Sequence, residues 1–474
     1  MPISLAEKKC LQRGLDFGWQ FRNQYVLSCD SDRNYPGWFK QHLGRWTLHH
    51  GDALRVTHMT DQDGAHVGWI LGHAIAPGRG IAEDSFQIAA HHSQHDFADV
   101  AEGVISDLAG KYLVILLTGD TERVYCDPVS DLPLLYDAQT GRLASSLGLV
   151  LDRPVVANPL FPARDVLSGK RTLSFGHTID RTVKRGLSSH YLDLSDFGQH
   201  RHWPPMDMAF SKNADDTKDI VDQIIERLSS HITVLTERFD CILPVSGGRD
   251  SRILLACASD RLDKLSEISG HRFHNPSRRD TALGKEIVQS LGKEYKTYFR
   301  KYPEMGQMRN MRLRMGWSGA RPEMEAVPMI EDLPRDHIVL RGNILELLRA
   351  SQWRRDKIDR PVHLTHGVRR LGVCIDHGGE ERKKWFGAYT DWLESLPPSA
   401  QKKPYDFAWV ELLLPNWQGA YFNGHNSTYF LNPFNDRKLI ELAISLPASL
   451  RINGEVVPLI LERACPELLN FRFQ

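Results

Sequence analysis

The sequence has few of the features that mark secreted, zinc-binding or nucleic-acid-binding proteins. Its seven cysteines are scattered without a Cys-x-x-Cys pair, and its histidines, including His271 and His274, show no metal-ligand spacing. The 59 basic residues balance 59 acidic ones, so no net charge favours nucleic acid or an anionic membrane. No apolar run reaches membrane-span length, and residues 1–14 lack a signal-peptide core. We therefore expect a cytoplasmic protein without nucleic-acid or membrane partners.

The size and composition are those of an ordinary globular enzyme. The 474 residues suffice for two or three domains with sizeable cores. Hydrophobic residues make up 41% of the chain and charged residues 25%, and no fixed-period repeat interrupts the sequence. Any functional signal must therefore come from local motifs.

The most informative stretch is FDCILPVSGGRDSRILLAC, residues 239–257. Residues 241–245 have the length and apolarity of a buried strand, residues 246–251 form a turn, and residues 253–256 begin a helix. Glycines let the backbone approach a ligand closely, and the free N–H groups of a first helical turn point at an anion. The stretch therefore predicts a phosphate site, whereas the alternative is an ordinary Ser-Gly-Gly turn that caps a helix.

The polar residues of this turn extend the prediction. Ser246 and Ser251 add hydroxyl donors. Asp250 would repel a phosphate unless a cation lay between them, which argues for Mg²⁺ held by Asp250 and phosphate oxygens.

The string SGGRDS resembles the pyrophosphate-binding loop, SGGxDS, of ATP pyrophosphatases, which adenylate a substrate with ATP and release pyrophosphate. It is neither a Walker loop nor a dinucleotide fingerprint, because no Gly-Lys-Ser/Thr follows and the glycines are adjacent. The resemblance implies an ATP site that includes this loop and the two strands beside it. Its residues would be Leu243, Ser246, Gly247, Gly248, Arg249, Asp250, Ser251 and Ser269, with a catalytic role for Arg249 and Asp250.

The N-terminal half alternates short β-like runs with turn signals. Asp63-Gly64 marks a hairpin turn, and residues 97–108 are typical of a helix. The pattern predicts a β-rich domain with two stacked sheets. Strands are expected at residues 46–50, 54–57, 67–72, 112–117, 123–126 and 133–136.

The order of these pieces resembles the glutaminase-type domain of asparagine synthetases. The strings are LGHAI, AGKYLVILL, VYCDPVSDLPLLYD and LASS, followed by residues 181–203. Glutamine-using members begin with a cysteine nucleophile, but here removal of Met1 would expose Pro2, and Cys10 lies in a charged helical stretch without a free α-amine. The resemblance therefore implies a scaffold without glutaminase chemistry, as in β-lactam synthetases and lasso-peptide cyclases.

The C-terminal half alternates helices with buried strands. An amphipathic helix is predicted at residues 215–236 and another at 280–291, with strands at 265–270, 295–298 and 337–340. Such alternation predicts a parallel sheet with helices on both faces, and ligands bind at the C-terminal ends of its strands.

Further residues are assigned through the resemblance to asparagine synthetases. Gly342 matches a glycine near the nucleotide, and Glu346, four residues on, would be the second Mg²⁺ carboxylate beside Asp250 or else a surface helix carboxylate. Asn343 replaces a catalytic glutamate, which puts acid–base chemistry there in doubt. The segment around Asp436 is expected to pack under the site, with Asp436 as a helix N-cap. Arg472 stands near a late family lysine that this chain lacks.

The arginines between residues 309 and 355 have two interpretations. Most fit a solvated helix face, whereas Arg341 and Arg349 could flank a triphosphate or an anionic substrate. Arg249 and Arg252, in or beside the turn, are the stronger candidates for that role.

Together these observations predict an α+β glutaminase-like sandwich (residues 1–205) followed by an α/β parallel-sheet ATP-pyrophosphatase domain (residues 206–474). The expected function is a glutamine-independent, Mg²⁺- and ATP-dependent amide-forming ligase acting on a small-molecule or peptide carboxylate. Two alternatives stay open: amidation of a sugar acid or small metabolite by ammonia or a diffusible amine, and a nucleotide-binding pseudoenzyme. A homodimer and a complex with a partner biosynthetic protein are both compatible with the sequence.

Overall fold

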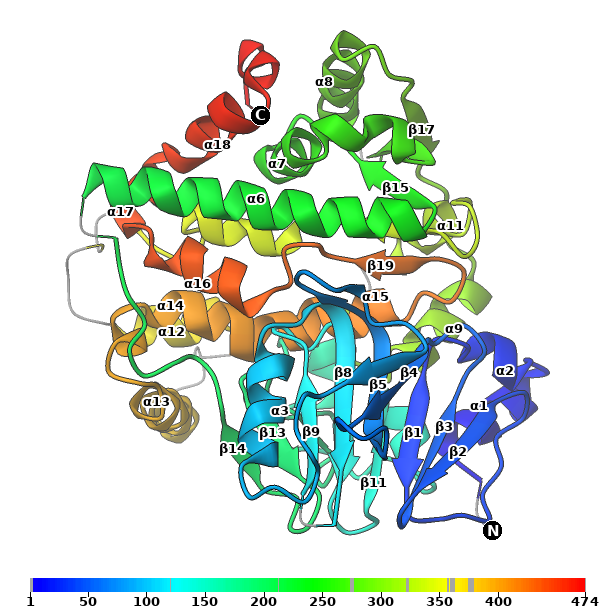
Figure 1. The fold of residues 1–474 in the computed structure, drawn as a ribbon. Helices are drawn as coiled ribbons and strands as arrows, with labels where there is room; N and C mark the ends of the chain where they lie inside the picture. Colours follow the sequence, from blue (N-terminus) through cyan, green and yellow to red (C-terminus); the bar gives the residue numbers. More distant parts are fainter. Residues whose placement is uncertain are drawn as a thin grey trace.

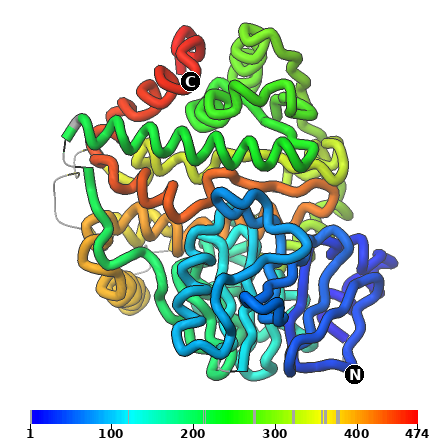
Figure 2. Tube along the Cα trace, in the orientation of Figure 1, coloured from blue at the N-terminus to red at the C-terminus, as the bar shows by residue number. Residues whose placement is uncertain are grey.

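The computed structural model describes residues 3–119, 121–211, 213–272, 277–320, 324–355, 358, 363–373 and 379–473. Met1, Pro2 and His274 lie outside these ranges. The β-rich N-terminal half lies on one side of the long helix α6 (Ala214–Arg238), and α7 (Arg249–Cys257), α8 (Ser277–Ser290) and the C-terminal helix α18 (Val456–Ala464) lie on the other (Figures 1 and 2).

Two largely antiparallel sheets form the described part of the N-terminal half. The first runs in the order β12 (Lys184–Arg185), β10 (Leu135–Asp137), β11 (Arg142–Ala144), β1 (Tyr25–Ser28), β3 (Trp46–His50) and β2 (Phe39–Leu43). The second runs in the order β14 (Gln199–Arg201), β13 (His190–Asp193), β9 (Glu122–Cys126), β8 (Ala109–Leu117), β5 (His66–Ala76), β4 (Val56–Thr60) and β7 (Ser85–Gln87), with β6 (Gly80–Ile81) beside β5.

Strand β8 is a continuous apolar run because both of its faces are buried. Its residues alternate between two cores, because successive side chains of a strand point to opposite faces. Leu113 packs with Leu27 and Trp46 of the first sheet. Val114 packs with Phe97 in the core that includes helix α3 (Phe97–Ser106). The second sheet is therefore covered on one face by the first sheet and on the other by a core that includes α3.

A parallel sheet forms the centre of the C-terminal half, as expected. Its order is β17 (Lys296–Phe299), β16 (Glu267–Arg272), β15 (Cys241–Pro244), β18 (Ile338–Leu340) and β19 (Tyr429–Leu431). The chain moves outward from β15 through β16 to β17, then returns to the other side of β15 as β18. The crevice between the ends of β15 and β18 is thus the switch point where ligands bind in such sheets.

Shorter helices fill the remaining space, and among the described residues no helix is long and apolar enough to cross a membrane. They are α1 (Leu5–Arg13), α2 (Phe17–Gln20), α4 (Leu147–Val150), α5 (Ala163–Leu167), α9 (Met305–Arg314), α11 (Val327–Ile330), α12 (Leu364–Arg370), α13 (Glu380–Glu394), α14 (Pro404–Ala408), α15 (Ala420–Asn423), α16 (Arg437–Ser445) and α17 (Ala448–Asn453).

Buried polar contacts join the two halves around the start of α16. The Gly110 N–H donates to the Asn435 carbonyl (2.8 Å), and the Arg437 guanidinium donates to the Tyr112 hydroxyl (3.0 Å). The Asp436 carboxylate accepts a hydrogen bond from the Leu439 N–H (3.1 Å), which confirms the predicted N-cap. The segment that leads from β19 into α16 is therefore anchored on strand β8.

Candidate functional site

A cavity of about 460 Å³ opens at the switch point of the parallel sheet. The turn after β15 and the segment after β18 form its floor. Three aromatic residues, Tyr421, Phe422 and Phe430, form an aromatic wall. The lining residues are Pro244, Val245, Ser246, Asp250, Ser251, His271, Ser277, Asp280, Ile330, Val339, Leu340, Arg341, Gly342, Asn343, Glu346, Tyr421, Phe422 and Phe430. Two polar segments about ninety residues apart in sequence thus meet at one cavity, in the place where a parallel sheet binds ligands.

The turn after β15 is closed by its own serines. The Ser246 N–H donates to Ser251 Oγ (3.0 Å), the two hydroxyl oxygens lie 3.0 Å apart, and the Gly248 N–H donates to Ser246 Oγ (3.1 Å). Gly248 then serves as the N-cap of α7 and has no side chain with which to cap it. The first-turn N–H groups of α7, which no helical carbonyl can reach, carry the positive end of the helix dipole toward the cavity.

Glycines allow the close approaches around this turn. A Cβ atom on Gly247 would lie 2.8 Å from Leu283 Cδ2 of α8, and one on Gly342 would lie 3.3 Å from Asp250 Cβ. The segment after β18 therefore packs against the start of α7.

The two predicted metal carboxylates face the same cavity in different environments. Asp250 accepts two hydrogen bonds from Arg349 (2.9 and 2.6 Å), which belongs to the 3₁₀ helix η2 (Asn343–Arg349). Burial raises the pKa of Asp250, while Arg349 opposes that shift. Burial and the nearby Asp250 raise the pKa of Glu346 to about 8, and its buried Oε2 has no hydrogen-bond partner. Glu346 thus lines the cavity instead of an outer helix surface, and the nearby charges of Arg349 and Arg341 only partly offset the effect of burial.

The raised pKa of Glu346 makes cation binding at this cavity dependent on pH. A cation must displace the proton from Glu346 below pH 8, so Mg²⁺ affinity in the presence of a non-hydrolysable ATP analogue should rise about fivefold from pH 7 to pH 8. Calorimetric titration at both values measures this. The Glu346→Gln variant should bind more weakly and with little pH dependence, whereas the exposed-site control Glu294→Gln should match the wild type. Equal affinities at pH 7 and 8 for the wild type would contradict the assignment.

The arginines differ from the sequence expectations. Arg341 forms an ion pair with Asp131 of the N-terminal half, and its guanidinium lies 3.8 Å from the centre of the Phe422 ring. Arg349 binds Asp250, as described. Arg252 is fully buried and donates to the Phe471 carbonyl (2.6 Å). Of these three arginines, Arg341 alone lines the cavity. Arg349 and Arg252 instead hold neighbouring segments in place through their hydrogen bonds.

Hydrogen bonds of Arg252 connect residues 471–472 to the turn after β15. No sequence pattern indicates this connection. Arg252 donates both to the Arg472 carbonyl (3.0 Å) and to the Gly247 carbonyl (3.1 Å). The guanidinium of Arg249 lies 5.3 Å from the Phe473 ring. Arg249 is therefore directed at the C-terminal segment and does not line the cavity, and the side chain of Arg472 is exposed.

Several other residues predicted for the ATP site lie outside the cavity lining. Leu243 and Ser269 are fully buried in β15 and β16, and they do not line the cavity; neither do Gly247 and Gly248. The aromatic wall of Tyr421, Phe422 and Phe430 was not predicted from sequence patterns. The density of aromatic residues in the stretch 417–430 was the available signal.

Cys10 has the environment of a structural residue. It is 2% exposed in α1, and burial raises the pKa of its thiol to about 11. The thiol therefore stays protonated at neutral pH and is a poor nucleophile, in keeping with the expected structural role.

A comparison of the chain with protein-family models found no match, and a comparison with curated proteins found no significant match. The case for a function consequently rests on the cavity and its residues.

Proposed function

We propose that this chain is a glutamine-independent, ATP-dependent amide-forming ligase. It adenylates a substrate carboxylate, releases pyrophosphate and joins the activated acyl group to an amine. The observation that carries this proposal is the meeting of the SGGRDS turn, Asp250 and Glu346 at one cavity on the switch point of a parallel sheet.

The turn supplies the anion-binding part of the proposed site. The first-turn N–H groups of α7 and the hydroxyls of Ser246 and Ser251 offer donors to the two phosphates that leave. The aromatic wall, including Phe422 and Phe430, suits a planar base or the apolar body of a substrate.

The two carboxylates fit a hard divalent cation. Carboxylate oxygens are the ligands that Mg²⁺ prefers, and the buried, unpartnered Oε2 of Glu346 is a position that a cation would satisfy. Asp250 and Glu346 would hold Mg²⁺, which when bound neutralises charge on the phosphate oxygens. Arg349 favours the ionised form of the Asp250 carboxylate and fixes it in position through two hydrogen bonds.

The proposed reaction has two displacements. A carboxylate oxygen of the substrate attacks the α-phosphorus, and the bond from that phosphorus to the bridging oxygen breaks to release pyrophosphate. The amine then attacks the acyl carbon, loses a proton and displaces AMP to form the amide. Asn343 cannot act as an acid or base, so most of the rate enhancement would come from positioning and charge stabilisation.

ATP–pyrophosphate exchange tests the proposal directly. Purified protein with Mg²⁺, ATP and labelled pyrophosphate should exchange label only when a suitable peptide or small-molecule carboxylate is present. Ammonium and organic amines, added separately, then show which nucleophile completes the amide. Appreciable hydrolysis of glutamine would overturn the glutamine-independent part of the proposal.

A nucleotide-binding pseudoenzyme is the second candidate, favoured by Asn343 in the cavity. Its signature would be tight ATP binding without exchange across the whole panel of carboxylates.

A further inference from the structure

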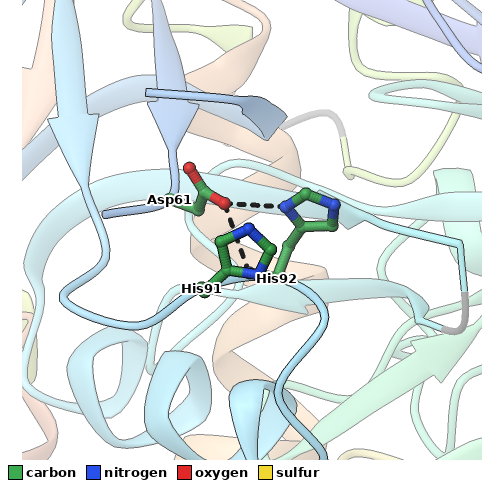
Figure 3. A group of neighbouring side chains, drawn as sticks. All are labelled: Asp61, His91 and His92. Carbon is green, nitrogen blue, oxygen red and sulfur yellow. Dashed lines mark hydrogen bonds and ion pairs between the residues drawn. The ribbon is translucent and has the colours of Figure 1, made fainter. Parts of the chain in front are cut away.

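A second polar cluster lies in the N-terminal half, outside the cavity described above. Strands β4 and β7 are parallel neighbours, so the segments that follow them leave the same edge of the sheet. Asp61 follows β4, and His91 and His92 lie on the segment that follows β7 (Figure 3).

Backbone hydrogen bonds hold these two segments together. The Ile88 N–H donates to the Thr60 carbonyl (2.8 Å), and the Gln62 N–H donates to the Ala90 carbonyl (3.0 Å). The Gln87 side chain adds a bond to the Gln62 carbonyl (3.0 Å). The cluster is therefore preorganised by the sheet and does not depend on two independent loops.

Asp61 is the fixed centre of the cluster. Its side chain is fully buried, and its oxygens accept hydrogen bonds from the N–H groups of Asp63 (3.0 Å) and Ala65 (2.8 Å). Its Oδ2 also lies 2.7 Å from His92 Nδ1 (Figure 3). The Asp61 carboxylate is therefore held in place by backbone N–H groups, with one oxygen next to an imidazole nitrogen of His92.

The imidazoles are close together and reachable from solvent. The His91 and His92 rings stack with centroids 4.6 Å apart, and their side chains are 32% and 39% exposed. One ligand atom each from Asp61, His91 and His92 can be chosen so that all lie within 4.8 Å of one another. Asp63 Oδ2 lies 3.4 Å from His91 Nε2 and adds a second carboxylate.

We propose that Asp61, His91 and His92, together with Asp63, bind a divalent transition-metal ion of the zinc, nickel or copper class. Imidazole nitrogens with carboxylate oxygens suit these ions, whereas Mg²⁺ favours an all-oxygen set. The ion would cross-link the β4–β5 turn to the segment after β7 and would stabilise the folded chain in proportion to its concentration.

Zinc titration of the metal-free, full-length protein tests this site. The wild type should bind one more Zn²⁺ than the His91→Ala/His92→Ala double variant, and each single variant should weaken that site about 10–100-fold or more. His95→Ala is the matched control, because His95 is exposed in the same segment and lies outside the cluster. Equal stoichiometry and affinity in the wild type and the double variant, meaning adventitious binding by other histidines only, would overturn the proposal.

A spectroscopic measurement separates lost ligands from a disturbed fold. X-ray absorption of the zinc-loaded wild type should show nitrogen and oxygen neighbours at about 2.0–2.2 Å with an imidazole contribution. The Asp63→Asn variant should retain that imidazole signal with weaker binding, and its circular dichroism should match the wild type. A zinc environment without imidazole in the wild type would contradict the assignment.

Discussion

Replacing Asp250 with asparagine is expected to reduce substrate-dependent ATP–pyrophosphate exchange by about 10²–10³-fold, the effect of removing one electrostatic stabiliser from a closed active site. Asparagine keeps the shape of the side chain but loses the charge that would hold Mg²⁺ beside the α7 turn. It also leaves Arg349 without its bidentate partner. Initial exchange rates at saturating ATP measure the effect.

The control for this variant lies at the opposite end of the same strand. Asp240 is exposed and precedes β15, so Asp240→Asn removes an equal charge without touching the cavity. Its exchange rate should stay within about twofold of the wild type, because surface substitutions away from special features have small effects. Full exchange activity in Asp250→Asn, with a normal melting temperature, would refute the proposed role of the turn.

Replacing Arg451 with methionine is expected to destabilise the protein by about 3–5 kcal/mol, because it leaves a charged partner buried without a counterion. Arg451 and Asp406 are both nearly fully buried and share two hydrogen bonds (3.0 and 2.8 Å). Arg451 also donates to the Leu347 carbonyl (2.8 Å) in the helix that carries Glu346. Urea unfolding monitored by circular dichroism measures the free energy of unfolding.

A surface pair provides the comparison for this loss. Arg463 pairs with Asp222 at an exposed site, so Arg463→Met should change the free energy of unfolding by less than about 1 kcal/mol. The double variant Arg451→Met/Asp406→Leu should recover much of the stability lost by the single change, since it removes both charges together. If the two single arginine variants were equally stable, the buried pair would not have the assigned importance.

The strands of the N-terminal half and the parallel sheet of the C-terminal half follow from patterns that the sequence displays. Continuous apolarity over β8 reflects burial of that strand on both faces, whereas in β3 apolar and polar residues alternate although all five are buried. Boundaries were less accurate: the predicted strand at residues 54–57 is shifted to Val56–Thr60, and β5 extends to Ala76. Bulges and pairing partners set these ends, and single-strand patterns do not contain them.

The SGGRDS turn was determined by the sequence alone, because a strand, two glycines and a helix start are consecutive and each acts within a few residues. Only the tertiary structure decided which groups meet there. Arg349 reaches Asp250 across 99 positions, and Arg252 binds the backbone of Phe471 across 219. The His91–His92 pair shows no ligand spacing along the chain, and it meets Asp61 only because β4 and β7 pair in parallel. Such contacts depend on sheet order and helix packing, which arise from burial of the whole chain and leave no local pattern at the residues themselves.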